Sequence, residues 1–151
     1  MSAKVFFRLC RPGLTGILLL IFACATVPFT ERQALHLVSD SEVSGMAVQQ
    51  YQKVLRESKL SKDPEKVHMV RSVGTKIAGA TEELLREKGL GSEVRNYKWE
   101  FNLIEDDKTV NAWCMPGGKV AVYTGILPVT QDENGIAVVM GHEIAHAVAK
   151  H

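Results

Sequence analysis

A chain of 151 residues is long enough for one modest domain, and its 46% hydrophobic and 23% charged residues are ordinary for a globular protein. The formal net charge is +1, the basic residues are spread out, and no basic patch is interleaved with aromatic residues, which argues against nucleic-acid binding. The sequence contains no internal repeat and no low-complexity tract.

The first segment has the pattern of a secretory signal. Three basic residues precede a ten-residue apolar run from Leu14 to Ala23, and Cys24 follows it. Such a run is too short to span a bilayer. Residues 21–24, Ile-Phe-Ala-Cys, resemble the bacterial lipobox, in which the Cys is acylated and becomes the new N-terminus. We therefore expect a signal peptide at 1–23 and a lipid-linked tether at 24–38, with a short uncleaved membrane anchor as the alternative.

The three cysteines do not predict a disulfide framework. Cys10 lies in the segment that would be removed, and Cys24 would carry lipid. Cys114 would then stand alone, so no intrachain disulfide is expected. Its position favours a half-buried strand residue over a nucleophile.

Two helices are predicted to open the domain at 39–151. Ser39 and Glu42 form a capping box before an apolar stripe that continues to about Ser58. Asp63-Pro64 is a second start signal, and the helix after it should end at Lys88, with Gly89 as its stop.

The next segment predicts a small antiparallel sheet. Apolar and polar residues alternate over 96–103, the period of a half-buried strand. Two further strand-like runs, 109–115 and 119–124, flank the turn at 116–118 and predict a hairpin. The fold class is therefore α+β: two helices, a small antiparallel sheet, then one long helix.

The last helix carries the chemistry. A capping box of Thr130 and Glu133 predicts its start, and the apolar run from 136 to 149 predicts a buried helix. His142 and His146 are four residues apart and share one face, so their two imidazoles can bind one zinc ion. Glu143 is adjacent and can act as general base toward a water that the metal activates. The alternative is an accidental pattern, but buried His and Glu side chains are costly without partners.

Three motifs in this order resemble metallopeptidase family forty-eight, which includes the CAAX prenyl proteases and the Oma-type mitochondrial peptidases. They are Asn-Ala-Trp-Cys-Met-Pro-Gly-Gly at 111–118, Tyr-Thr-Gly-Ile-Leu at 123–127, and Gly-His-Glu-Ile-Ala-His at 141–146. The resemblance extends from about Phe29 to the end, and Cys-Ala-Thr-Val-Pro at 24–28 is similar to the lipoprotein branch of bacterial envelopes.

The resemblance implies a zincin-like domain of the gluzincin type. Zinc would lie on His142 and His146, Glu143 would be the catalytic base, and a Glu on a later helix would be the third ligand. It also implies that Asn111, Ala112 and Trp113 lie on a sheet edge that pairs with an extended substrate, as an open strand edge can.

The chain departs from the family pattern because no Glu follows His146 before the last residue, His151. His151 is nine positions from His142, on the opposite helix face, which argues against it as a ligand. We therefore expect an N-terminal part of a longer protein, with the third ligand beyond His151, and an inactive fragment.

The expected function is that of a zinc-dependent metalloendopeptidase of the bacterial cell envelope, lipid-anchored and facing the periplasm, with a role in envelope protein quality control. One zinc ion is the expected cofactor, and an extended protein or peptide is the expected partner. Two alternatives stay open: a non-catalytic, chaperone-like envelope lipoprotein with the zincin fold, and a structural lipoprotein whose motif is accidental.

Overall fold

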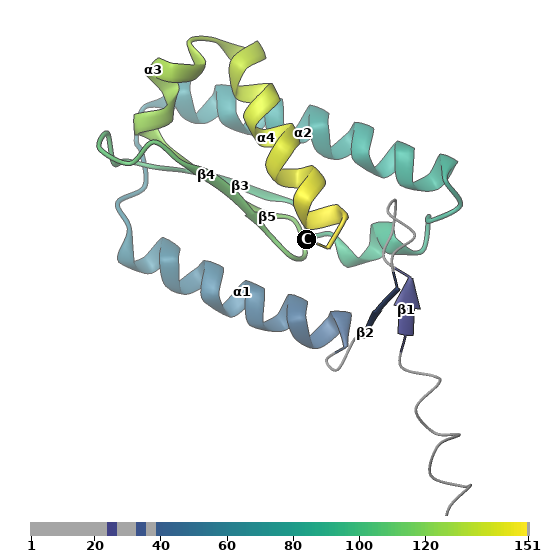
Figure 1. The fold of residues 1–151 in the computed structure, drawn as a ribbon. Coiled ribbons are helices and arrows are strands. Elements are labelled where there is room, and N and C mark those ends of the chain that lie inside the picture. Colours follow the sequence, from purple (N-terminus) through teal and green to yellow (C-terminus); the bar gives the residue numbers. More distant parts are fainter. Residues whose placement is uncertain (1–23, 27–32, 36–38, 151) are drawn as a thin grey trace, which may run out of the picture.

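The computed structural model describes residues 24–26, 33–35 and 39–150 (Figure 1). The predicted signal peptide at 1–23 and His151 lie outside the described residues. The elements are β1 Cys24–Thr26, β2 Gln33–Leu35, α1 Asp40–Glu57, α2 Pro64–Glu87, η2 Glu93–Asn96, β3 Glu100–Ile104, β4 Ala112–Met115, β5 Lys119–Tyr123, η3 Thr124–Ile126, α3 Leu127–Thr130 and α4 Glu133–Val148.

The two predicted scaffold helices are confirmed, together with the residues that start and stop them. The Ser39 side chain accepts from Glu42 N–H, and the Glu42 carboxylate accepts from Ser39 N–H, so the capping box is complete. At the start of α2, the Asp63 carboxylate accepts from the first backbone N–H groups, and Pro64 occupies the first turn. The helix ends before Gly89, whose φ of +75° lies in the left-handed region that favours glycine.

The sheet is mixed rather than antiparallel, which corrects the prediction. Its strand order is β3-β5-β4. The hairpin of β4 and β5 is antiparallel as expected, but β3 pairs with β5 in parallel, with Phe101 opposite Val120. The connection from β3 leads to the far edge, and the hairpin then brings β5 back into the centre. Chain neighbours predict the hairpin, whereas the position of β3 depends on tertiary packing.

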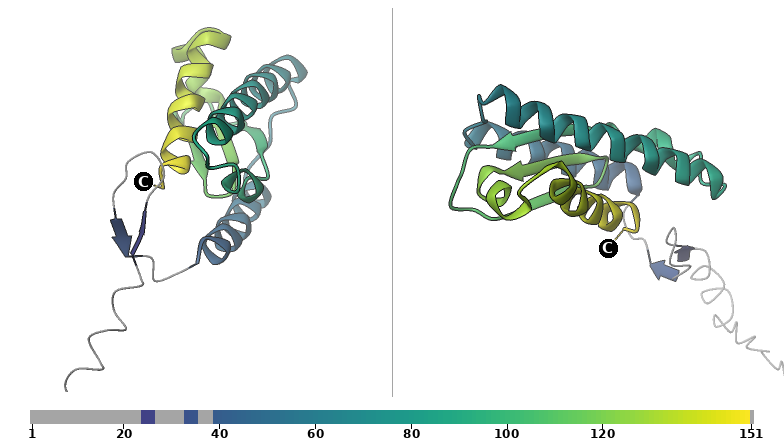
Figure 2. Two further views of the ribbon diagram at one scale, coloured as in Figure 1. Left: turned by 90° about the vertical axis from the view of Figure 1, so that its right-hand side faces the viewer. Right: turned by 90° about the horizontal axis from the view of Figure 1, so that it is seen from above.

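The sheet lies between two helical layers (Figures 1 and 2). On one face, Val120 and Val122 of β5 join a core with residues of α2 and α4. On the other face, Ala121 joins Tyr51 of α1, which is fully buried and donates a hydrogen bond to Val120 O at 3.1 Å. This alternation along β5 follows from the two-residue period of a strand, and it fixes α4 against the sheet.

The start of α4 also differs from the prediction. Thr130 does not cap it, because Thr130 ends α3 and donates to Leu127 O. Gln131 then adopts a φ of +65°, which interrupts the helical path. Asp132 is the observed cap, and its carboxylate accepts from Gly135 N–H at 2.9 Å.

The apolar composition of α4 predicts burial on all sides, and the structure buries one side. Ile136, Met140, Ile144 and Val148 face the core. Val138, by contrast, is 74% exposed. The exposed side of α4 is the side that carries the two histidines.

Two glycines in α2 give a matched test of packing. A Cβ at Gly74 would lie 2.6 Å from Cε1 and 2.7 Å from Cγ of the buried Phe101 ring, whereas a Cβ at Gly79 meets nothing within 4 Å. We expect Gly74→Ala to lower the free energy of unfolding by about 1–3 kcal/mol. Gly79→Ala should raise it by about 0.5–1 kcal/mol, because Gly is a poor helix former. Urea unfolding of both variants measures this, and equal effects would contradict the close contact of α2 with β3.

The predicted tether contributes two short strands, β1 and β2, which pair antiparallel with Ala25 opposite Ala34. Among the described residues, no helix combines the length and the hydrophobicity needed to cross a membrane.

Candidate metal centre and substrate edge

The side chains of His142 and His146 converge, as their four-residue spacing predicts. Their Nε2 atoms lie 3.0 Å apart, and the two rings stand edge to face with centroids 4.4 Å apart. Both residues are exposed. Two ring nitrogens this close together, on adjacent turns of one helix, can share a ligand.

The separation of the two nitrogens fits a single zinc ion. Zn–N bonds of about 2.0–2.1 Å in a tetrahedral site place two ligand nitrogens about 3.3 Å apart. The observed 3.0 Å therefore needs only a small change of the ring torsions. Within 24–26, 33–35 and 39–150, no third His, Cys, Asp or Glu stands close enough to complete a metal site. The described residues therefore include two side chains, those of His142 and His146, that could serve as ligands of a catalytic zinc ion.

Glu143 lies between the histidine pair and the sheet. Around the helix axis it falls between His146 and the buried Ile144, at about 100° per residue. It is half-buried, and its carboxylate is close enough to Cys114 on β4 to influence that thiol. Burial, and secondly the negative charge of Glu143, raise the pKa of Cys114 to about 12. Glu143 therefore lies near β4.

Cys114 should consequently behave as an inert, neutral thiol, as its sequence context predicts. With Cys10 and Cys24 replaced by Ser, we expect iodoacetamide at about pH 8.5 to alkylate it in the folded chain about one hundred times more slowly than in urea. The unfolded thiol loses its proton from about pH 9 and the folded thiol only near pH 12. The contribution of Cys114 to stability is therefore complete below pH 9 and is lost as pH rises toward 12. Equal alkylation rates would contradict this.

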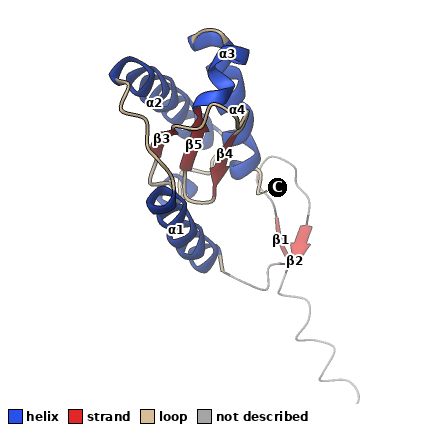
Figure 3. Cartoon of the chain, turned by 90° about the vertical axis from the view of Figure 1, so that its left-hand side faces the viewer, coloured by secondary structure: helices blue, strands red, loops and turns tan. Residues whose placement is uncertain are grey.

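Strand β4 is an edge strand in the described sheet (Figure 3). Tyr123 N–H donates to Asn111 C=O at 3.1 Å. Backbone groups in an antiparallel pair alternate between the partner and the outer edge. Residues in step with Asn111, namely Trp113 and Met115, therefore face β5, whereas Ala112 and Cys114 direct their N–H and C=O groups outward.

The structure refines the three residues predicted to bind substrate. Ala112 and Trp113 lie in β4, and Asn111 directly precedes it. The Asn111 side chain accepts from Ala112 N–H at 2.9 Å, so it already satisfies one group of the open edge. The Trp113 ring packs edge to face on Tyr51 in the α1 layer, which is a core role.

Cys114 is the site residue that sequence reasoning missed. It shares the open edge with Ala112, and the two-residue alternation of a strand could have indicated this once Ala112 was placed there. Prediction from the sequence concerned only the thiol of Cys114, whereas the backbone N–H and C=O groups of Cys114 are the groups that lie on the open edge.

Residues 72–151 match the description Peptidase family M48. This match covers more than half of the chain, and the chain therefore belongs to this family of metallopeptidases.

Similar proteins agree with that assignment. The mitochondrial metalloendopeptidase OMA1 of Schizosaccharomyces pombe is 50% identical over 60 residues, 40% of this chain and 18% of that protein. The mitochondrial metalloendopeptidase OMA1 of Homo sapiens is 26% identical over 148 residues, 98% of this chain and 27% of that protein. A Vibrio cholerae protein, whose name describes a beta-barrel assembly-enhancing protease, is 42% identical over 45 residues, 30% of this chain and 9% of that protein. The chain spans about a quarter or less of these relatives' lengths.

Proposed function

We propose that the complete protein is a zinc-dependent endopeptidase of the bacterial cell envelope that cuts extended segments of proteins. The observation that carries the proposal is the convergence of the His142 and His146 Nε2 atoms, 3.0 Å apart, on a helix packed against the edge strand β4. Membership of a metallopeptidase family supports the same chemistry.

Each site residue has a distinct role in this proposal. His142 and His146 hold the zinc ion, which when bound lowers the pKa of water and polarises a carbonyl group. Glu143 is not a ligand. It takes the proton of the attacking water and delivers it to the nitrogen of the leaving amine, as a positioned carboxylate can.

The open edge of β4 holds the substrate in an extended conformation. The outward C=O group of Ala112 and the outward N–H and C=O groups of Cys114 offer backbone hydrogen bonds that do not depend on substrate sequence, whereas the Ala112 N–H already donates to the Asn111 side chain. Such binding places a peptide bond of the substrate next to Glu143, because α4 packs directly on β4.

The third zinc ligand is proposed to come from a Glu beyond residue 151. The exposed side of α4, with Val138 and the two histidines, is where an additional helix would pack. Chain 1–151 alone should therefore bind zinc weakly and should not cleave casein, because a catalytic zinc normally has three protein ligands. Submicromolar zinc affinity with casein cleavage by this fragment would place the third ligand within it.

The envelope location rests on the sequence of the first 24 residues. We propose that Cys24 is acylated and tethers the protein to a membrane, with the catalytic domain in the periplasm. Cys24→Ser should abolish lipid attachment in intact-mass analysis, and a wild-type protein that keeps Met1 and carries no lipid would contradict the lipoprotein assignment.

A second candidate function is a non-catalytic envelope protein that binds extended chains on β4. The observation that favours it is the pair of histidines without a third ligand among the described residues. Incubating the complete protein with unfolded casein separates the two. The endopeptidase should cut casein, lose activity with 1,10-phenanthroline and recover it with zinc, whereas the binding protein should retain casein intact.

A further inference from the structure

We infer that the cavity between α1, η2 and the last turn of α4 is a subsite that binds a large apolar side chain of the extended polypeptide paired with β4. This inference rests on the proposed function, because it takes an extended polypeptide as the occupant. It adds a preference for one kind of substrate side chain to a site that otherwise recognises only the substrate backbone.

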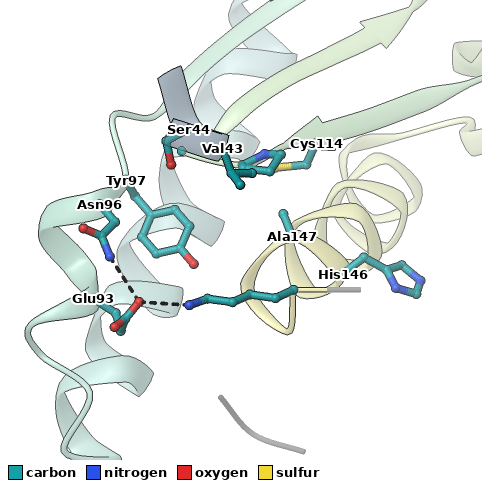
Figure 4. Close-up of a pocket in the computed structure, with 11 residues that line it drawn as sticks. Val43, Ser44, Glu93, Asn96, Tyr97, Cys114, His146 and Ala147 are labelled. Atoms are coloured by element: carbon teal, nitrogen blue, oxygen red, sulfur yellow. Dashed lines mark hydrogen bonds and ion pairs between the residues drawn. The ribbon is translucent and has the colours of Figure 1, made fainter. Parts of the chain in front are cut away.

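The cavity has the size and the lining for such a side chain. It encloses about 330 Å³, at the lower end of the range of about 300–1,000 Å³ typical of ligand pockets. Its apolar walls come from four parts of the chain (Figure 4): Val43 of α1, Tyr97 after η2, Cys114 with Pro116, and Ala147 of α4. The thiol of Cys114 is neutral, so it adds no charge to these walls.

The charged residues of the cavity are paired with one another at one end. Glu93 Oε2 lies 3.8 Å from Lys150 Nζ and accepts a hydrogen bond from Asn96 Nδ2 at 3.1 Å (Figure 4). Because the charges of Glu93 and Lys150 offset each other, the cavity does not require a charged group on the side chain that occupies it. An uncharged, apolar side chain is therefore the group that the cavity suits.

Cys114 connects this cavity to the substrate edge. Its backbone groups point outward from β4, and its side chain lines the cavity. A residue paired opposite Cys114 would direct its side chain to the same face of the sheet, with Cβ atoms about 4.5–5.5 Å apart. An extended chain paired with β4 therefore directs every second side chain to the face of the sheet on which the cavity lies, and the residue opposite Cys114 is the one beside the cavity.

The cavity also adjoins the candidate metal centre. Ala147 lines it directly after His146, whose ring points away from the cavity in Figure 4. The bound side chain and the peptide bond that is cut would thus lie beside neighbouring parts of α4. The subsite should therefore set the position of cleavage along the substrate.

The test measures binding and cleavage separately. The probes are fluorescein-labelled decapeptides of Ser and Ala in which one Leu or Phe is moved stepwise along the chain. Their affinity for the complete protein carrying Glu143→Gln is measured by fluorescence anisotropy. Hydrolysis by the complete protein with Glu143 intact is mapped by mass spectrometry, which gives the register of the apolar residue relative to the cut.

One position of the apolar residue should tighten binding about tenfold or more over the parent peptide, the range in which filling an apolar pocket discriminates side chains. Val43→Trp and Ser44→Phe, which fill the cavity from α1, should remove this preference while leaving the parent peptide bound. Gln49→Trp, on an exposed part of α1, is the matched control and should keep it. Circular dichroism confirms that each variant is folded.

Equal affinity at every position, or a preference that survives both filling variants, would overturn the subsite. A position-dependent affinity without any hydrolysis by the protein with Glu143 intact would instead overturn the endopeptidase function and leave the subsite standing.

Discussion

Replacing Glu143 by Gln in the complete protein is expected to lower kcat/KM for peptide hydrolysis by about 10²–10⁴-fold, the usual contribution of a general base. An amide has nearly the size of the carboxylate but cannot accept the proton of the attacking water. Glu143 neighbours a proposed zinc ligand without being one, so zinc should stay bound. Initial rates on casein and the metal content of the same sample measure both effects.

Glu83→Gln is the matched control, because Glu83 is an exposed glutamate on α2 and not on the helix that carries the two histidines. It should leave activity and metal content unchanged. Full activity of the Glu143→Gln protein with zinc bound would remove Glu143 from the role of base and leave the metal centre intact.

Replacing His146 by Ala should remove zinc and activity together. The two Nε2 atoms lie 3.0 Å apart, so replacing either ring removes one of the two proposed zinc ligands. Because the proposed zinc would both lower the pKa of the attacking water and polarise the substrate carbonyl, the rate loss should equal or exceed that of Glu143→Gln. Zinc per chain and casein cleavage are measured after dialysis against zinc-free buffer.

His68→Ala provides the control for a histidine outside the site. His68 is exposed on α2, and its loss should change neither zinc content nor rate. Retained stoichiometric zinc in the His146→Ala protein would show that the metal is held elsewhere.

Local sequence signals predicted the helices well because each signal acts within one turn. The Ser39 capping box, Pro64 at the start of α2 and Gly89 after its end all function as predicted. The spacing of His142 and His146 predicted their convergence for the same reason, since one helix fixes both side chains.

Features that depend on contacts between distant segments were beyond the sequence signals. The parallel pairing of β3 with β5 depends on which strand enters the middle of the sheet. The alternation of apolar and polar residues in β3 does not predict this, because it would be the same whether β3 paired with β4 or with β5. The Thr130 capping box was wrong because Gln131 turns the chain at a positive φ and Asp132 replaces it as the cap. Which face of α4 stays exposed is likewise set by the layers packed on it.

The account is tested most directly by zinc-edge anomalous diffraction from crystals of the complete protein. It predicts one peak per chain, about 2.0–2.1 Å from the Nε2 atoms of both His142 and His146, with the third protein ligand visible beside them. Glu143 should lie near that peak without coordinating it. The absence of a peak between the two rings in crystals grown with zinc, or a zinc ion bound only at other residues, would contradict the proposed metal centre.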